Sequence, residues 1–217
     1  ALSIHIHCPE NAGFVEIDVR HLDDRRDPLL YVQFADTASA QLEVLLMRVN
    51  DPHAPRFEID RDWQGESTKL GTATRNIPAE IKAMNAGLAP GQVRKGLRLS
   101  RDLVPIMTAF AASMGKDLFF IEPLAYHNAI LFEKYGFAYL RGRVMMEQIH
   151  QGFQPGGELV AKLDGSTPFR MPGAERTVRG RSWAIHDGIL DKPWTQIRMY
   201  KRVDRAANVC TFPNAIY

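Results

Sequence analysis

Several basic residues crowd a glycine-containing turn in the middle of the chain. Residues 91–100 read GQVRKGLRLS and stand directly before an apolar helical pattern. Four cations occupy the turn and the first helical residues: Arg94, Lys95, Arg98 and Arg101. N–H groups at a helix start lack partners and the helix dipole is positive there, so these cations are unfavourable unless an anion binds. The pattern predicts a phosphate-binding turn around Gly96 and Leu97, with a solvated basic turn as the alternative.

Three side chains are candidates for moving a proton. Glu122 lies in the apolar stretch FFIEPL, where a charge is costly unless it is paired or used, so we expect it to be partly buried with a raised pKa. Glu58, in FEID, is the second candidate and His127 is the third. Each has a structural alternative, because carboxylates often face solvent and a single helical histidine often only packs in the core.

The elements that must position these residues change in type along the chain. Alternating apolar residues predict strands at 14–22, 28–38, 40–51, 56–62 and 194–203, and denser apolar runs predict strands at 117–124 and 137–142. Helices are expected at 78–87, 99–114 and 125–135. The second helix should bury one apolar face: Leu99, Leu103, Met107, Phe110 and Met114. This order predicts an α/β (α+β) fold with a mixed, mainly antiparallel sheet flanked by helices.

The order of these elements resembles that of the Gcn5-related N-acetyltransferase (GNAT) superfamily, over about residues 29–141 in topology and 92–137 in motif. In that family a Gln/Arg-x-x-Gly-x-Gly/Ala turn presents its N–H groups to the pyrophosphate of coenzyme A. Gly96 takes the place of the central glycine. Val93 stands where Gln or Arg is usual, and Arg98 where a second Gly or Ala is usual. The chain is therefore similar to a divergent member.

A second family motif, Asn-x-x-Ala-x-x-Leu-Tyr-Glu-Lys-Leu-Gly-Phe, is similar to AYHNAILFEKYGF at residues 125–137. The residues that match the motif are Leu131, Glu133, Lys134, Gly136 and Phe137. Ala125 occupies the Asn position, and Asn128 offers an amide nearby. Phe132 replaces the tyrosine that protonates the departing thiolate in the family, and Tyr135 is the expected substitute. A core helix that ends at a glycine cap would also explain this stretch.

The resemblance implies a single GNAT-like domain over residues 1–217, with an insertion near 63–90 and a long irregular excursion at about 151–190. It implies transfer of an acyl group from acetyl-CoA, another acyl-CoA or a carrier-protein thioester to a small-molecule amine acceptor. The expected catalytic residues are Glu122, Tyr135 and His127, and the expected coenzyme-binding residues are Arg94, Lys95, Gly96, Leu97, Arg98, Arg101 and Asn128. A catalytically inactive domain of this fold that binds a ligand or partner is the alternative.

Two other stretches could bind ligands. His5 and His7 could share one strand face, but a metal site would need further ligands such as His21 or His53, so we expect no metal. The stretch RGRSWAIHDG at residues 179–188 could line a cleft through its arginines and Trp183, or could be a strand followed by an Asp-Gly turn.

Composition limits the class of protein. The 217 residues carry a net charge of +2, too little for the dense basic surface typical of a nucleic-acid-binding protein, and contain no apolar run long enough to span a membrane. Cys8 and Cys210 are expected to be free thiols. We therefore expect a cytoplasmic protein that binds no nucleic acid and could form a homodimer.

Overall fold

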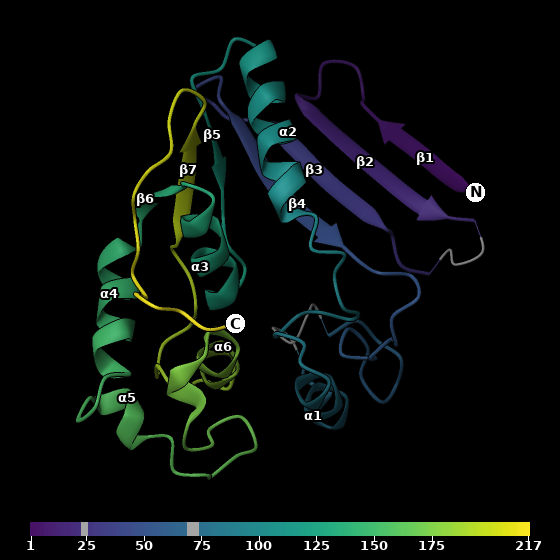
Figure 1. The fold of residues 1–217 in the computed structure, drawn as a ribbon. Coiled ribbons are helices and arrows are strands. Elements are labelled where there is room, and N and C mark those ends of the chain that lie inside the picture. The colour runs from purple at the N-terminus through teal and green to yellow at the C-terminus, as the bar shows by residue number, and fades with distance from the viewer. Residues whose placement is uncertain (23–25, 69–73) are drawn as a thin grey trace.

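The computed structural model describes residues 1–22, 26–68 and 74–217. Among these residues, seven strands form one open sheet in the order β1-β2-β3-β4-β5-β7-β6 (Figure 1). The strands are β1 (Leu2–His7), β2 (Phe14–His21), β3 (Leu30–Asp36), β4 (Leu42–Val49), β5 (Leu118–Ile121), β6 (Ala138–Arg141) and β7 (Arg198–Arg202). Strands β4 and β5 are parallel, and the other neighbouring pairs are antiparallel. The expected mixed, mainly antiparallel α/β architecture is confirmed.

Helices cover the sheet and its ends. They are α1 (Ile77–Asn85), α2 (Ser100–Ser113), α3 (Tyr126–Lys134), α4 (Arg143–Gly152), α5 (Glu158–Ala161) and α6 (Val178–His186), with a 3₁₀ turn η1 (Ala174–Arg176). Helix α1 begins as its sequence predicts, because Asn76 caps the N–H of Ala79 and Pro78 occupies the first turn. Gly136 ends α3 in the left-handed conformation, with φ of 78°.

Residues 56–62 do not form the strand that their alternation suggested; they form an irregular segment with turns. The backbone of this segment pairs elsewhere: the Phe57 N–H donates to the Val93 carbonyl and the Asp62 N–H to the Glu66 carbonyl. The Arg56 side chain also binds Asp27 and Asp60, which holds this segment in an irregular path. Glu58 consequently pairs with Arg56 at 2.7 Å and does not line the cavity described below. It is therefore not a suitable base.

Helix α2 packs on the half of the sheet formed by β3 and β4 (Figure 1). Its buried residues are Val104, Met107 and Ala111, which share one face at spacings of three and four. Met107 is buried as expected, but Phe110 and Met114 are 40% and 42% exposed. The buried face is therefore rotated from the predicted one, because the small side chain of Ala111 lets the helix approach the sheet on that side.

The C-terminal third joins the same sheet and core. Residues 194–203 were predicted to form a strand, and β7 within them pairs with both β5 and β6, the strand after Gly136. The region at 151–190 contains α5, η1 and α6, so it is more helical than its irregular composition suggested. Residues 179–188 are mainly helical rather than a strand, because Thr177 caps the N–H of Gly180 and Gly188 follows the last turn.

Candidate functional site

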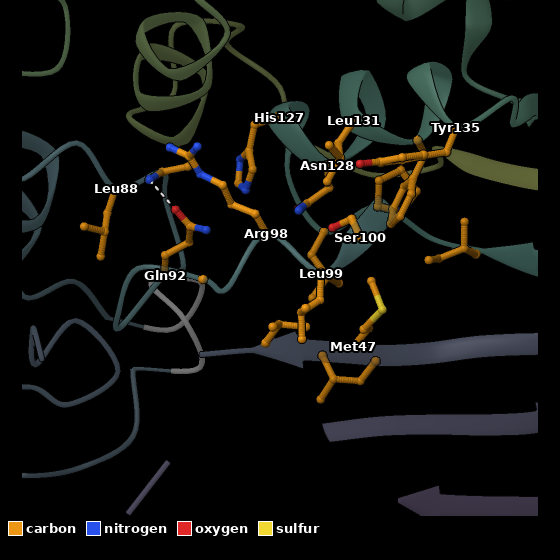
Figure 2. Close-up of a pocket in the computed structure, with 18 of the residues that line it drawn as sticks. Met47, Leu88, Gln92, Arg98, Leu99, Ser100, His127, Asn128, Leu131 and Tyr135 are labelled. Atoms are coloured by element: carbon orange, nitrogen blue, oxygen red, sulfur yellow. Dashed lines mark hydrogen bonds between the residues drawn. The ribbon is translucent and has the colours of Figure 1, made fainter. Parts of the chain in front are cut away.

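A cavity of about 630 Å³ lies where β4 and β5 separate (Figure 2). The two strands pair only at Leu42–Val44 and Phe119–Ile121. Strand β5 ends at Ile121 while β4 continues to Val49, so the end of β4 has no strand partner on this side among the described residues. Val44, Met47 and Val49 of β4 line the cavity. The unpaired backbone groups of this edge can bind an extended ligand.

The turn before α2 closes one end of the cavity. Gly96, Leu99 and Ser100 line it, and α2 begins without a side-chain cap. Within the described part of the chain, none of the backbone N–H groups of residues 96–101 donates a hydrogen bond. These free N–H groups lie at or just before the start of α2, at the positive end of the helix dipole, which is a general anion-binding arrangement.

Contacts with the end of β4 hold this turn in place. The Lys95 carbonyl accepts a hydrogen bond of 2.8 Å from the Asp51 N–H, just beyond β4. A Cβ on Gly96 would lie 3.1 Å from the Val49 carbonyl oxygen, closer than most side chains come to a backbone oxygen. Glycine at this position therefore lets the turn pack tightly against the unpaired edge, so the amides and the edge border one cavity.

Three cations line the cavity: Lys95, Arg98 and Arg179. None of them forms an ion pair with a described residue; Arg179 donates a hydrogen bond to the Gly87 carbonyl. Glu122 is the one described lining residue with a carboxylate side chain, and it lies at the exposed rim. The cavity therefore carries an excess of positive charge that suits an anionic ligand.

Other cations of the basic turn have different positions. Arg94 lies away from the cavity, where its Nε is 2.8 Å from Asp27 and its guanidinium donates to the Pro52 and Ala54 carbonyls. Leu97 and Arg101 do not line the cavity either, although their backbone amides belong to the turn. Of the four cations in this segment, Lys95 and Arg98 line the cavity, and we leave Arg94 out of the anion site.

Helix α3 forms the opposite wall. His127, Asn128, Leu131 and Tyr135 line the cavity and lie on one side of the helix and its C-cap, at spacings of three and four (Figure 2). The Tyr135 side chain extends into the cavity toward Asn128. Tyr135 and Glu122 therefore line the same cavity. Phe132 also lines the cavity but is buried and has no proton to give.

His127 is buried in this wall. Its Nδ1 lies 2.9 Å from the Ser182 hydroxyl of α6. Burial, together with the nearby charge of His186, lowers the pKa of His127 to about 4. The imidazole is therefore neutral at physiological pH and can exchange a hydrogen bond with a ligand, but it is a weak base.

Glu122 differs from its expectation. It was expected to be partly buried, but its side chain is 61% exposed. The reason is that β5 ends at Ile121, so Glu122 follows the strand and projects at the cavity rim. Arg198 Nε is 4.0 Å from a Glu122 carboxylate oxygen. Glu122 remains within the lining, where it can take a proton from an incoming group directly or through water.

A short loop before the basic turn forms the remaining wall, and α6 holds it. Arg179 donates a hydrogen bond to the Gly87 carbonyl, and the indole Nε1 of Trp183 donates to the Leu88 carbonyl at 2.9 Å. Gln92 Oε1 accepts from the Ala89 N–H at 2.7 Å, which closes the loop on itself (Figure 2). Arg179 and Trp183 are one helical turn apart, so a single face of α6 positions this wall.

Arg179 was absent from the expected site residues. The stretch 179–188 had suggested a cleft through Trp183 and Arg181, but Trp183 is buried against the loop and Arg181 is buried between the Phe153 and Phe212 rings. The helix signals at Thr177 and Gly188 would have placed Arg179 on the same face as Trp183, one turn earlier, and on a different face from Arg181.

The N-terminal histidines lie far from this cavity in the sheet, on the edge strand β1. No group of three or more potential metal ligands occurs among the described residues, and His5 and His7 are exposed. Cys8 and Cys210 are both free and exposed. None of the described helices has the length and apolar character needed to cross a bilayer.

Comparisons with known proteins return nothing similar: no family model, no curated protein and no solved structure matches the chain. Function must therefore be argued from the cavity itself.

Proposed function

We propose that this chain is an acyltransferase that moves an acyl group from an acyl-CoA, or from a carrier-protein thioester, to an amine acceptor. The observation that carries the proposal is the meeting of the free N–H groups of residues 96–101 with the unpaired edge of β4 in one cavity. The first can bind a phosphate and the second an extended, amide-containing arm, which are the two parts of such a donor.

The positive charge and size of the cavity support this assignment. Lys95 lies beside the free amides and can pair with a donor phosphate. A volume of about 630 Å³ lies within the usual range for sites that bury a small molecule. The order of strands and helices is also the one on which the resemblance to the GNAT superfamily rests.

The lining supplies groups for the proton transfers. The acceptor nitrogen attacks the thioester carbon, the carbon–sulfur bond breaks, and the nitrogen loses a proton. Glu122 at the rim takes that proton, and the Tyr135 hydroxyl protonates the departing thiolate. The neutral His127 positions the acceptor by hydrogen bonding rather than serving as the main base.

Apolar residues between the two polar ends favour a donor with an acyl chain. Met47, Leu99, Leu131 and Phe132 line this part of the cavity. Such a surface gains about 0.8 kcal/mol for each buried methylene of an acyl chain. Acyl groups longer than acetyl are therefore part of the proposal.

Coenzyme binding is the first test. Millimolar acetyl-CoA should raise the thermal unfolding temperature, since a ligand at 100 times its dissociation constant adds about 2.7 kcal/mol to stability. Lys95→Met should weaken binding roughly 10-fold, as expected for one lost charge-assisted contact. Arg101→Met is the matched control, because Arg101 carries the same charge in the same segment but does not line the cavity. Absence of any acetyl-CoA or CoA binding would reject the proposed function.

Turnover is the second test. Glu122→Gln should lower the acyl-transfer rate on the order of 100-fold, which is within the range for loss of a general base. Tyr135→Phe should lower turnover while coenzyme affinity stays nearly unchanged, because the hydroxyl acts mainly in the transition state. If both variants keep full turnover, these residues have other roles. Binding without turnover across amine acceptors would instead favour the inactive, ligand-binding alternative.

A further inference from the structure

Two cations line the cavity besides Lys95, the residue assigned to the donor phosphate. Arg179 comes from α6 and contacts the wall at Gly87, while the Arg98 side chain lies between Gln92 and His127 (Figure 2). Both residues line the cavity, and neither has an ion-pair partner among the described residues. By contrast, the half-buried arginines Arg56 and Arg75 each pair with two or more carboxylates. The positive charges of Arg98 and Arg179 are therefore not balanced by carboxylates among the described residues.

The strained backbone conformation of Arg98 indicates that its side chain has a functional role in the cavity. Its φ is 57°, in the left-handed region that a residue with a Cβ enters only at a cost of roughly 1–2 kcal/mol. A glycine would adopt this conformation without strain, and the resemblance places a Gly or Ala at this position. A strained residue that lines a cavity is most simply explained by a ligand that uses its side chain.

Hydrogen bonds from α6 hold the cavity wall beside Arg179, and they leave most of the Arg179 guanidinium free to bind an anion. Trp183 holds the Leu88 carbonyl, and Arg179 holds the Gly87 carbonyl through one guanidinium nitrogen, Nη1. The other guanidinium nitrogens of Arg179 make no hydrogen bond to a described residue. His127 is bound to Ser182 and neutral, so it adds a hydrogen-bonding group without a competing negative charge.

We propose that Arg98 and Arg179 form a second anion site, which binds an acid group carried by the amine acceptor. The proposal rests on the proposed function and names its acceptor class: a small amine that bears a carboxylate or a phosphonate, such as an amino acid. The backbone N–H of Arg98 stays with the donor turn, while its guanidinium faces the acceptor. Planar guanidinium groups suit such acids because they offer paired N–H donors.

The test measures binding of N-acylated products to the full chain with CoA bound. Every acceptor of this class would yield such a product. N-acetylglycine, its neutral amide N-acetylglycinamide and N-acetylaminomethylphosphonate are titrated separately by protein-observed NMR. We expect at least one acid to bind 10-fold or more tightly than the amide, because the amide leaves the arginines unpaired. The relative affinities of the carboxylate and the phosphonate identify the acid group.

Variants separate this site from the donor site. Arg179→Met should abolish the preference for the acid, Arg179→Lys should restore part of it, and both should keep the affinity for acetyl-CoA measured for the wild type. Arg176→Met, in the turn before α6, is the matched control because Arg176 is exposed and does not line the cavity. Equal binding of acids and amide, no binding of any of the three, or an unchanged preference in Arg179→Met would each overturn the second site while acetyl-CoA binding still supports the donor site.

Discussion

Two basic regions lie a few residues apart in the sequence and have opposite electrostatic surroundings. Arg94 and Arg56 surround the Asp27 carboxylate, with Nε to Oδ2 distances of 2.8 and 2.9 Å. Arg98 and Arg179 line an open cavity and have no carboxylate partner among the described residues. Burial alone would raise the pKa of Asp27, but the hydrogen bonds and charges of Arg94 and Arg56 outweigh it and hold that pKa below its ordinary value.

The number of cations in a segment does not by itself locate a ligand site. What matters is whether carboxylates of the protein already neutralise them. In the Asp27 region the positive charge is neutralised within the protein, so it stabilises the fold and attracts nothing further. In the cavity the positive charge is uncompensated, and a bound anion is the means of balancing it. Arg94 and Arg98 show both outcomes only four residues apart.

The largest effect is expected from removing one of the arginines that pair with Asp27. Arg56→Met should destabilise the protein by about 3 kcal/mol or more, because it leaves Asp27 and Asp60 short of a partner in a largely buried position. Chemical denaturation measures the change in the free energy of unfolding. Arg98→Met is the counterpart in the cavity and should change that free energy by no more than about 0.5 kcal/mol. Similar losses in the two variants would show that Arg98 also has a structural partner.

The second prediction concerns His127, a buried group in the cavity wall without an opposite charge. Its pKa is about 4 in the folded chain and about 6.5 when unfolded, so the unfolded chain binds more protons between these pH values. Stability should therefore fall as pH drops from about 6.5 to 4, by about 3 kcal/mol from this group. Denaturation at several pH values should show this slope in the wild type and a smaller one in His127→Asn. His5→Asn, at an exposed site, should keep the wild-type slope.

The smallest effect concerns the strained backbone. Arg98→Gly should raise stability by up to about 1 kcal/mol, since glycine adopts a positive φ without the steric cost of a Cβ. The same variant should weaken binding of the acids named above. Thermal unfolding with and without those acids measures both changes. A loss of stability without ligand would mean that the Arg98 side chain contributes to the fold.

Much of the sheet could be predicted from local patterns. Strands β2, β3 and β4 follow their alternating residues, α1 begins at its Asn76 cap, and α3 ends before the glycine cap at Gly136. Residues 56–62 have an equally good alternation, but the Phe57 N–H donates to the Val93 carbonyl, so this segment is bound to the basic turn rather than to a strand. The buried face of α2 likewise depends on the sheet beneath it. Propensity predicts an element, whereas its partner is set by long-range packing.

The site was predictable where its residues are local in sequence. The turn at Gly96 and the wall at His127, Asn128 and Tyr135 come from motifs that can be read directly. Arg179 could not be found in this way, because its place depends on a helix that folds back onto Gly87 from 92 residues downstream. The pairing of Arg94 with Asp27 was also hidden, since 67 residues separate them.

The bonds from α6 to the loop at Gly87 and Leu88 also set the order in which the site can be completed. The chain between this loop and Trp183 is 95 residues long, as measured from Leu88. A ribosome that adds roughly 5–20 residues per second needs on the order of 5–20 seconds to make that length. During this interval β4 and the basic turn already exist, but the wall that carries Arg179 does not. Under the proposed function, a nascent chain acquires its donor half before its acceptor half, and the cavity becomes selective only once α6 has emerged.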